Sequence, residues 1–216
     1  MQKVDLLVIG GGINGSGVAR DAAGRGLKVI LCEKDDLAQA TSSSSTKLIH
    51  GGLRYLEFLH FKLVRESLRE REILLNSMPH IIWPLRFILP HHKGLRPIWL
   101  LRLGLFIYDH IGGRKLLPST KTINLKKHLA GIPLKDKFSV GFEYSDCWVE
   151  DSRMVVLNAI DAKNNNAEIL THTSFIGAKR RNNIWEVELI NNRTKEKISI
   201  ISKAIVNCAG PWVIKI

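Results

Sequence analysis

The sequence is poor in cysteine, with only Cys32, Cys147 and Cys208. These residues lie far apart and never take the C-x-x-C spacing that is typical of zinc sites and redox motifs. Neither a disulfide framework nor a metal site is therefore expected. A reducing compartment fits this usage, and we expect the three cysteines to be small apolar residues of a core.

Long apolar runs are also lacking, since no stretch reaches the roughly 18 residues of a membrane-spanning helix. The N-terminal apolar segment is short and leads straight into glycines, which argues against a secretory signal. Neither a P-loop of the form G-x-x-x-x-G-K-[ST] nor a G-x-S-x-G nucleophile elbow occurs. The sequence thus gives no sign of a P-loop nucleotide hydrolase or of an α/β-hydrolase.

Acidic residues are in short supply, because 20 Asp and Glu stand against 32 Lys and Arg and leave a formal net charge of +12. Such an excess indicates an anionic partner: a phosphorylated ligand, an anionic membrane surface or a nucleic acid. The 216 residues, of which 45% are hydrophobic, suffice for one domain or for one large and one small.

What the sequence does contain is a dinucleotide-binding pattern at its start. A short apolar strand leads into Gly10-x-Gly12-x-x-Gly15, a predicted helix follows, and a second apolar strand ends in Glu33. This β-α-β unit, residues 4–33, is the arrangement that binds the ADP half of a dinucleotide.

Each part of the unit has a mechanical role. Gly10 allows a sharp turn, Gly12 leaves room for a pyrophosphate, and Gly15 lets the helix pack closely against the strand. The helix N-terminus offers free N–H groups and a positive dipole end to the phosphates. Glu33 is placed to accept hydrogen bonds from ribose hydroxyls and would repel a 2′-phosphate, so FAD or NAD is expected rather than NADP.

Periodicity predicts the remaining elements. A helix is expected at 61–77, with Val64, Leu68 and Leu75 on one face and a solvated face of Arg and Glu, and another at 151–164. Strands are expected at 169–173, at 185–190 and 198–201 as a hairpin or meander, and at 204–210, where a buried strand ends at a glycine. Residues 41–46 have the composition of a flexible linker, but we expect a hydroxyl-rich binding loop, because functional residues resume immediately.

Residues 81–116 combine large apolar side chains with basic ones, and Asp109 is the only acid. This mixture is typical of a segment lying at a membrane interface. A buried pair of helices with basic edges explains it equally well, and both interpretations stay open. His91 and His92 are expected at the surface, and 117–141 as a polar loop.

Six segments together carry a resemblance to a known family: 9–15, 21–26, 40–43, 47–57, 142–149 and 207–212. They resemble the bacterial, aerobic type of FAD-dependent, quinone-linked glycerol-3-phosphate dehydrogenase, from residue 4 to residue 212. The block 47–57 is the most specific, because many flavoproteins share the glycines and few share that block.

The resemblance implies an α/β protein with a Rossmann-like FAD-binding domain of the glutathione-reductase or amino-acid-oxidase type, and the start of a second, substrate-side region. Arg54 and Tyr55 would lie near the substrate, glycerol 3-phosphate. The residues that would contact FAD are Gly10, Gly12, Gly15 and Glu33 at its ADP part, Thr41, Ser42, Ser45 and Lys47 along the pyrophosphate and flavin, Phe175 near the adenine, and Gly210.

The implied reaction oxidises glycerol 3-phosphate to dihydroxyacetone phosphate by hydride transfer to flavin N5, with quinone as electron acceptor at the inner face of the cytoplasmic membrane. A homodimer is considered. No catalytic residue is assigned, because His50 is more typical of a residue that stabilises a turn. Members of this family are longer, so we expect this chain to be an N-terminal portion with impaired activity.

Alternative functions stay open at this point. One is a non-catalytic FAD-binding or membrane-bound remnant. Another is an amino-acid or hydroxy-acid oxidase of the same flavoprotein superfamily, against which the block 47–57 argues. Nucleic-acid binding rests on charge alone, without a recognisable motif, and is not expected.

Overall fold

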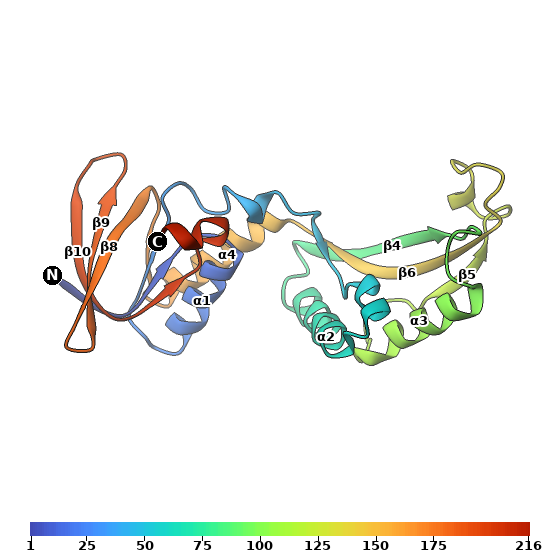
Figure 1. The fold of residues 1–216 in the computed structure, drawn as a ribbon, viewed down its shortest axis with the longest axis horizontal. Coiled ribbons are helices and arrows are strands. Elements are labelled where there is room, and N and C mark those ends of the chain that lie inside the picture. Colours follow the sequence, from blue (N-terminus) through green and yellow to red (C-terminus); the bar gives the residue numbers. More distant parts are fainter. The chain divides into compact units, whose positions relative to one another are not determined.

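The computed structural model describes residues 1–216, apart from the side chain of Lys215. The chain forms two compact units (Figure 1). The first comprises Met1–Thr46 and Glu150–Ile216, and the second is Lys47–Val149.

The first unit is built on a six-stranded sheet in the order β7-β2-β1-β10-β9-β8. Its strands are β1 (Gln2–Ile9), β2 (Val29–Cys32), β7 (Glu168–Leu170), β8 (Thr173–Arg181), β9 (Ile184–Asn191) and β10 (Lys197–Asn207). β7, β2, β1 and β10 run parallel, with α1 (Ile13–Gly24) as the crossover between β1 and β2. β9 pairs antiparallel with β8 and β10, so the predicted hairpin of β9 and β10 is confirmed.

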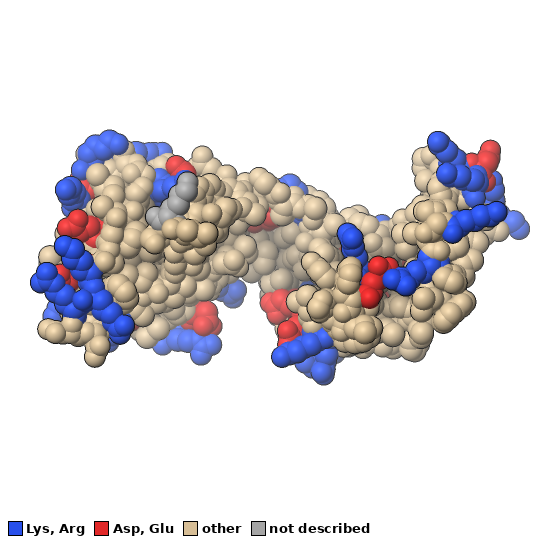
Figure 2. Space-filling view, viewed as in Figure 1, with Lys and Arg blue, Asp and Glu red and all other residues tan. Residues whose placement is uncertain are grey.

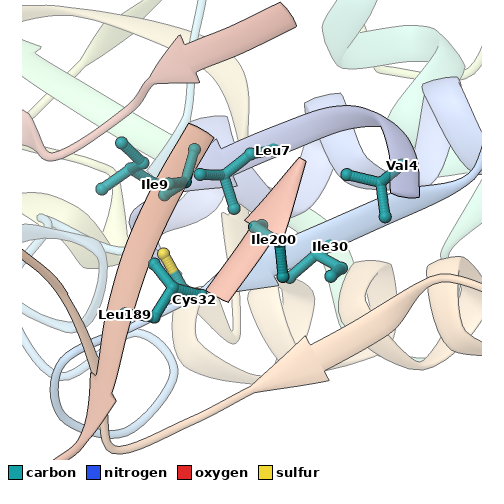
Figure 3. Packing of buried hydrophobic residues seen from close by; sticks show 8 residues of the cluster. Val4, Leu7, Ile9, Ile30, Cys32, Leu189 and Ile200 are labelled. Carbon is teal, nitrogen blue, oxygen red and sulfur yellow. The ribbon is translucent and has the colours of Figure 1, made fainter. Parts of the chain in front are cut away.

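β1 is buried on both of its faces, as its continuous apolar run predicts. On one face Leu7 packs with Ile30 and Ile200 (Figure 3). On the other face Val8 packs with Ala19 of α1. The strand that precedes the glycine turn is therefore held rigidly between two cores.

Two helices, α1 and α4 (Asp151–Asn164), pack against each other. The predicted bounds of α4 are confirmed. Ala22 and Ala23 of α1 are buried with Ala162 of α4, and small side chains of this kind let two helix axes approach closely. At the exposed edge of this contact, Arg20 Nε lies 2.6 Å from Asp161 Oδ2.

The structure corrects two strand predictions in this unit. Residues 198–201 and 204–207 belong to one strand, β10, rather than to two. The predicted burial of the second part is wrong, because β9 pairs with β10 only as far as Ser202, and beyond it Ala204 is exposed. The strand predicted at 169–173 is the end of β7 and the start of β8, separated by a turn in which His172 has a φ of +52°.

The second unit contains a four-stranded antiparallel sheet. In it β6 (Val140–Val149) pairs with β3 (Leu48–Ile49), β4 (Ile82–Pro90) and β5 (Lys121–Asn124). Helices α2 (Phe61–Ser77) and α3 (Ile98–Ile111) lie along one face of the β4–β6 sheet (Figure 1). The predicted bounds of α2 are confirmed.

The pair of helices considered for 81–116 is wrong in its first half, which is strand β4. Pro84 disfavours a helix interior. Two aromatic residues of β4 instead stack on aromatic residues of β6: Trp83 stacks on Trp148 with ring centroids 4.6 Å apart, and Phe87 stacks on Tyr144 at 5.3 Å. Residues 117–141 are not simply a polar loop either, because they include β5.

α2 buries Val64, Leu68 and Leu75, as its periodicity predicts. It also buries Arg71, which the sequence places on the solvated face. The reason is a buried acceptor on β6, Asp146, whose Oδ1 lies 2.6 Å from Arg71 Nη1. A charge can be buried when an opposite charge and hydrogen bonds compensate it.

The cysteines behave as core residues where they are fully enclosed: Cys32 and Cys147 are buried, and Cys208 is half-buried. Across the residues that the structure describes, no helix has the length and apolar character to cross a membrane.

Candidate cofactor site

The first unit contains a cavity of ≈ 560 Å³ at the carboxyl ends of β1 and β2. It is lined by the glycine turn after β1, the residues after β2, the turn Thr41–Ser43, the start of β8 and the residues after β10. In open α/β sheets, ligands bind in this position, outside the carboxyl ends of parallel strands.

The glycine turn has the geometry that the motif predicts. Gly10 has a φ of +109°, and a Cβ there would lie 2.5 Å from the carbonyl oxygen of Cys208. A Cβ on Gly15 would lie 1.8 Å from the carbonyl oxygen of Gly10, so the start of α1 rests directly on the turn. α1 therefore begins at the cavity wall, where its first residues Ile13 and Asn14 lie.

Glu33 follows β2 and lines the cavity. Its Oε2 accepts a hydrogen bond from Gly11 N at 2.7 Å, and its Oε1 accepts one from Asp35 N at 2.9 Å. A carboxylate has about four acceptor positions, so lone pairs remain for ribose hydroxyls. Glu33 thus fixes the glycine turn as well as lining the cavity, a second role that the sequence does not reveal.

Ser42 caps α1 from a distant part of the chain, since its Oγ accepts a hydrogen bond from Ile13 N at 2.9 Å. This bond satisfies one of the N–H groups that a helix leaves free at its start. In the same turn, Ser43 Oγ donates to Ala40 O at 3.0 Å. The segment 41–46 is therefore a hydrogen-bonded turn against the helix, not a linker.

The structure brings most of the predicted cofactor residues to this one cavity: Gly10, Gly12, Glu33, Thr41, Ser42, Phe175 and Gly210 line it. The other three do not. Gly15 lies behind the turn, Ser45 Oγ donates to Asp151 Oδ2 of α4 at 2.7 Å, and Lys47 belongs to the second unit. Contact of any of these residues with FAD stays a prediction.

Several lining residues were not predicted, among them Thr173, Ser174, Cys208 and Trp212. All four lie within three residues of Phe175 or Gly210 in the sequence, and this proximity to two predicted cofactor residues could have identified them. Asn192, which the sequence does not mark at all, braces the wall: its Nδ2 donates to Lys34 O at 2.6 Å and to Ser174 Oγ at 2.9 Å.

The charges around the cavity favour backbone recognition of phosphate. Of the lining residues, Lys34 is basic, whereas Glu33 and Asp35 are acidic. Lys34 Nζ lies 4.4 Å from the ring centroid of Trp212. A pyrophosphate here would therefore depend on the N–H groups at the start of α1 and on the helix dipole.

The excess positive charge lies partly elsewhere in the first unit, over β8, β9 and β10, where Figure 2 shows a group of Lys and Arg side chains. The exposed basic residues of these strands include Lys179, Arg180, Arg181, Lys197 and Lys203. The excess positive charge is thus not confined to residues 81–116.

The predicted substrate residues Arg54 and Tyr55 lie in the second unit, exposed on the turn Leu53–Phe58. The turn follows Gly52, which has a φ of +68°, and His50 Nδ1 accepts a hydrogen bond from Gly52 N at 3.0 Å. The interpretation of His50 as a turn-stabilising residue is confirmed. In the described part of the chain, no group of three or more His, Cys, Asp or Glu is placed to hold a metal ion.

The model of the FAD dependent oxidoreductase family matches residues 5–216. The chain belongs to this family. Its cofactor is accordingly FAD, and the residues present fit that group: a Cβ-free turn, an acidic residue at the end of β2 and a helix that begins at the cavity. The predicted α/β FAD-binding fold is confirmed.

The resemblance to glycerol-3-phosphate dehydrogenases is also confirmed. The chain is 52% identical over 213 residues to the aerobic glycerol-3-phosphate dehydrogenase of Escherichia coli, covering 99% of this chain and 42% of the relative. It is 62% identical over 212 residues to D-erythritol 1-phosphate dehydrogenase of Brucella abortus, covering 98% of this chain and 42% of the relative. The chain thus spans less than half the length of either relative.

Among solved structures, the glycerol-3-phosphate dehydrogenase of Bacillus halodurans complexed with FAD matches with a TM-score of 0.73 and 29% identity. That match covers 99% of this chain and 35% of the other. An L-amino acid deaminase from Proteus myxofaciens has the same TM-score, 0.73, at 19% identity, which shows a shared fold and no more.

Proposed function

We propose that this chain is the FAD-binding part of an enzyme that oxidises a secondary alcohol of a polyol phosphate, with glycerol 3-phosphate as the first candidate. The observation that carries the proposal is the cavity at the ends of β1 and β2, with Glu33 bonded to the glycine turn. The 52% identity to a glycerol-3-phosphate dehydrogenase supports this substrate.

The chemistry that FAD supplies is acceptance, at flavin N5, of the hydride from C2 of glycerol 3-phosphate, whose C2 hydroxyl loses a proton as dihydroxyacetone phosphate forms. The protein must hold a dianionic phosphate during this step. Arg54 is exposed and carries a guanidinium, the donor best suited to bidentate binding of phosphate. Quinone is proposed as the electron acceptor.

A second candidate substrate is D-erythritol 1-phosphate, because the relative of that name is 62% identical to this chain. The two candidates share a terminal phosphate and differ in the length of the carbon chain. Both candidates would use the same binding site, since the Arg54 guanidinium can bind the phosphate of either compound.

The experiment is anaerobic reduction of the FAD-loaded chain, followed by the loss of flavin absorbance. Bleaching by either polyol phosphate, and slower bleaching by the Arg54→Ala variant, is the expected result. Faster bleaching by an amino acid would instead identify an amino-acid oxidase. A yellow protein that none of these compounds reduces would identify a non-catalytic FAD-binding chain.

A membrane surface is proposed as the place where quinone is met, with α3 as the contact. Trp99 is 67% exposed and Phe106 is 54% exposed on this helix, and two exposed basic residues, Lys93 and Arg96, precede it in the sequence. Exposed aromatic residues flanked by basic ones are typical of helices that lie in an anionic interface.

Flotation with vesicles containing anionic lipid tests this contact. The Trp99→Ser/Phe106→Ser variant should lose vesicle binding, whereas Ile176→Ser, which removes an exposed apolar side chain of β8, should retain it. Equal flotation of wild type and the α3 variant would disprove a role for this helix.

A further inference from the structure

The second unit contains a buried polar chain that ends at the backbone of the Gly51–Gly52 turn. Arg71 Nη1 donates to Asp146 Oδ1 at 2.6 Å, and the Tyr108 hydroxyl donates to the same oxygen at 2.8 Å. Gly51 N in turn donates to the Tyr108 hydroxyl oxygen at 2.8 Å. Arg71, Asp146 and Tyr108 are each at most 4% exposed.

The direction of each hydrogen bond follows from the chemistry of the groups. The guanidinium of Arg71 only donates, and the carboxylate of Asp146 only accepts. The Tyr108 proton must therefore point to Asp146, which turns the lone pairs of the hydroxyl toward the N–H of Gly51. Burial and the Asp146 charge raise the pKa of the Tyr108 hydroxyl, so this hydroxyl keeps its proton near neutral pH.

The backbone at Gly51 lies so close to Leu68 and Tyr108 that no side chain larger than that of glycine fits there. A Cβ on Gly51 would lie 2.3 Å from Leu68 Cδ2 and 2.8 Å from the Tyr108 hydroxyl. Three and four residues after Gly51 come Arg54 and Tyr55, which are exposed near the start of the turn Leu53–Phe58. The backbone that carries both side chains therefore continues directly from the anchored residue Gly51.

We infer that Tyr108 is a positioning residue for phosphate recognition: its hydroxyl, oriented by Asp146 and Arg71, anchors Gly51 and thereby presents Arg54 and Tyr55 to a phosphorylated substrate. The anchoring follows from the contacts above, and its consequence for the substrate rests on the proposed function. Phenylalanine at position 108 keeps the ring and removes the anchor, leaving a buried N–H without a partner.

The test compares Tyr108→Phe with Tyr144→Phe in the full chain loaded with FAD. Tyr144 is a matched control, because it is a half-buried tyrosine of β6 whose ring packs edge-on against that of Tyr108 on α3. Amide hydrogen exchange across residues 51–55 is measured first. Exchange about tenfold faster in Tyr108→Phe, with no such change in Tyr144→Phe, is the expected result.

Binding is measured next, by titrating glycerol 3-phosphate and following the backbone amide signals of Arg54 and Tyr55. The dissociation constant should rise about tenfold in Tyr108→Phe alone, and KM should rise with kcat nearly unchanged. Unchanged exchange in Tyr108→Phe would overturn the anchoring. Faster exchange with unchanged ligand affinity would overturn the role in recognition.

Failure of the proposed function looks different from failure of this inference. If glycerol 3-phosphate and D-erythritol 1-phosphate leave the Arg54 and Tyr55 signals of the wild type unmoved, the proposed substrate class is wrong, and with it the role of Tyr108 in recognition. The exchange comparison needs no ligand, so it still decides whether Tyr108 anchors the turn.

Discussion

The carboxylate of Glu33 accepts a hydrogen bond from the backbone N–H of Gly11 at 2.7 Å, which ties the end of β2 to the glycine turn after β1. Both segments line the cavity assigned to FAD. The Glu33 side chain therefore fixes the glycine turn and also faces the cavity. Its removal should alter the conformation of the turn as well as the contacts with the ligand.

Replacing Glu33 with alanine should weaken FAD binding by at least about tenfold, because two hydrogen bonds from backbone N–H groups to a charged acceptor are lost near the ligand. Quenching of flavin fluorescence on titration measures the affinity. Glu188→Ala is the control, since Glu188 is an exposed carboxylate of β9. Equal FAD affinities for the Glu33 variant and wild type would show that Glu33 does not hold the cofactor.

Replacing Gly15 with alanine should destabilise the first unit by about 3 kcal/mol, because the new Cβ would meet the Gly10 carbonyl oxygen, which is backbone and has little room to move. Gly17→Ala, two residues further along α1, has nothing within 4 Å of its Cβ. That variant should gain about 0.5–1 kcal/mol from helix propensity. Urea unfolding, followed by circular dichroism, compares the two; destabilisation of both by a similar amount would contradict the close approach.

The Arg86–Glu143 ion pair should make the stability of the second unit depend on pH. Arg86 Nη2 lies 2.7 Å from Glu143 Oε2, and its hydrogen bond holds the pKa of Glu143 below the ordinary value of 4.5. Because the pKa is depressed in the folded state, the stabilisation is present above pH 4.5 and is lost as pH falls through the lower, folded value. At pH 7 it should amount to about 1 kcal/mol, given that both side chains are partly exposed.

Glu143→Gln tests this pH dependence through the difference in unfolding free energy from wild type at two pH values. The difference should be present at pH 7 and should shrink in acid, where wild-type Glu143 is also uncharged. A difference that is the same at both pH values would mean that the charge of Glu143 contributes nothing.

Alkylation should distinguish the three cysteines. Burial raises the pKa of Cys32 to about 12 and that of Cys147 to about 11, so neither thiol forms a reactive thiolate near neutral pH. Cys208 is half-buried and lines the cavity, and burial raises its pKa as well. Peptide mass spectrometry after iodoacetamide treatment of the native protein should find slow labelling at Cys208, reduced further by FAD. Labelling of Cys208 that FAD does not change would place the cofactor away from this residue.

The elements predicted correctly are those whose formation depends on local pattern. The helices at 61–77 and 151–164 have a 3.6-residue periodicity that reports on their own packing faces. The turn at Gly10 depends on a positive φ, which only the identity of that residue decides. Such features can be predicted from the sequence because residues close together in the chain determine them.

The features missed are those that need a partner far along the chain. Residues 82–90 look like part of a helix until their aromatic side chains find those of β6, some 60 positions away. Ser42 is correctly expected in a binding loop, but its hydrogen bond from Ile13 N, 29 positions away, is not predicted. No motif or periodicity in the sequence predicts the hydrogen bond from Asn192 to the Lys34 carbonyl.

By itself the sequence determined the cofactor class and the glycine turn that receives it, because the steric limits on φ and on Cβ contacts act within neighbouring residues. Only the tertiary structure decided which polar side chains are buried and what they do there. Arg71 and Asp146 illustrate this, since either charge buried alone is costly, and only the fold that brings them to 2.6 Å lets each compensate the other. The same fold places the Tyr108 hydroxyl where it accepts the hydrogen bond from Gly51 N.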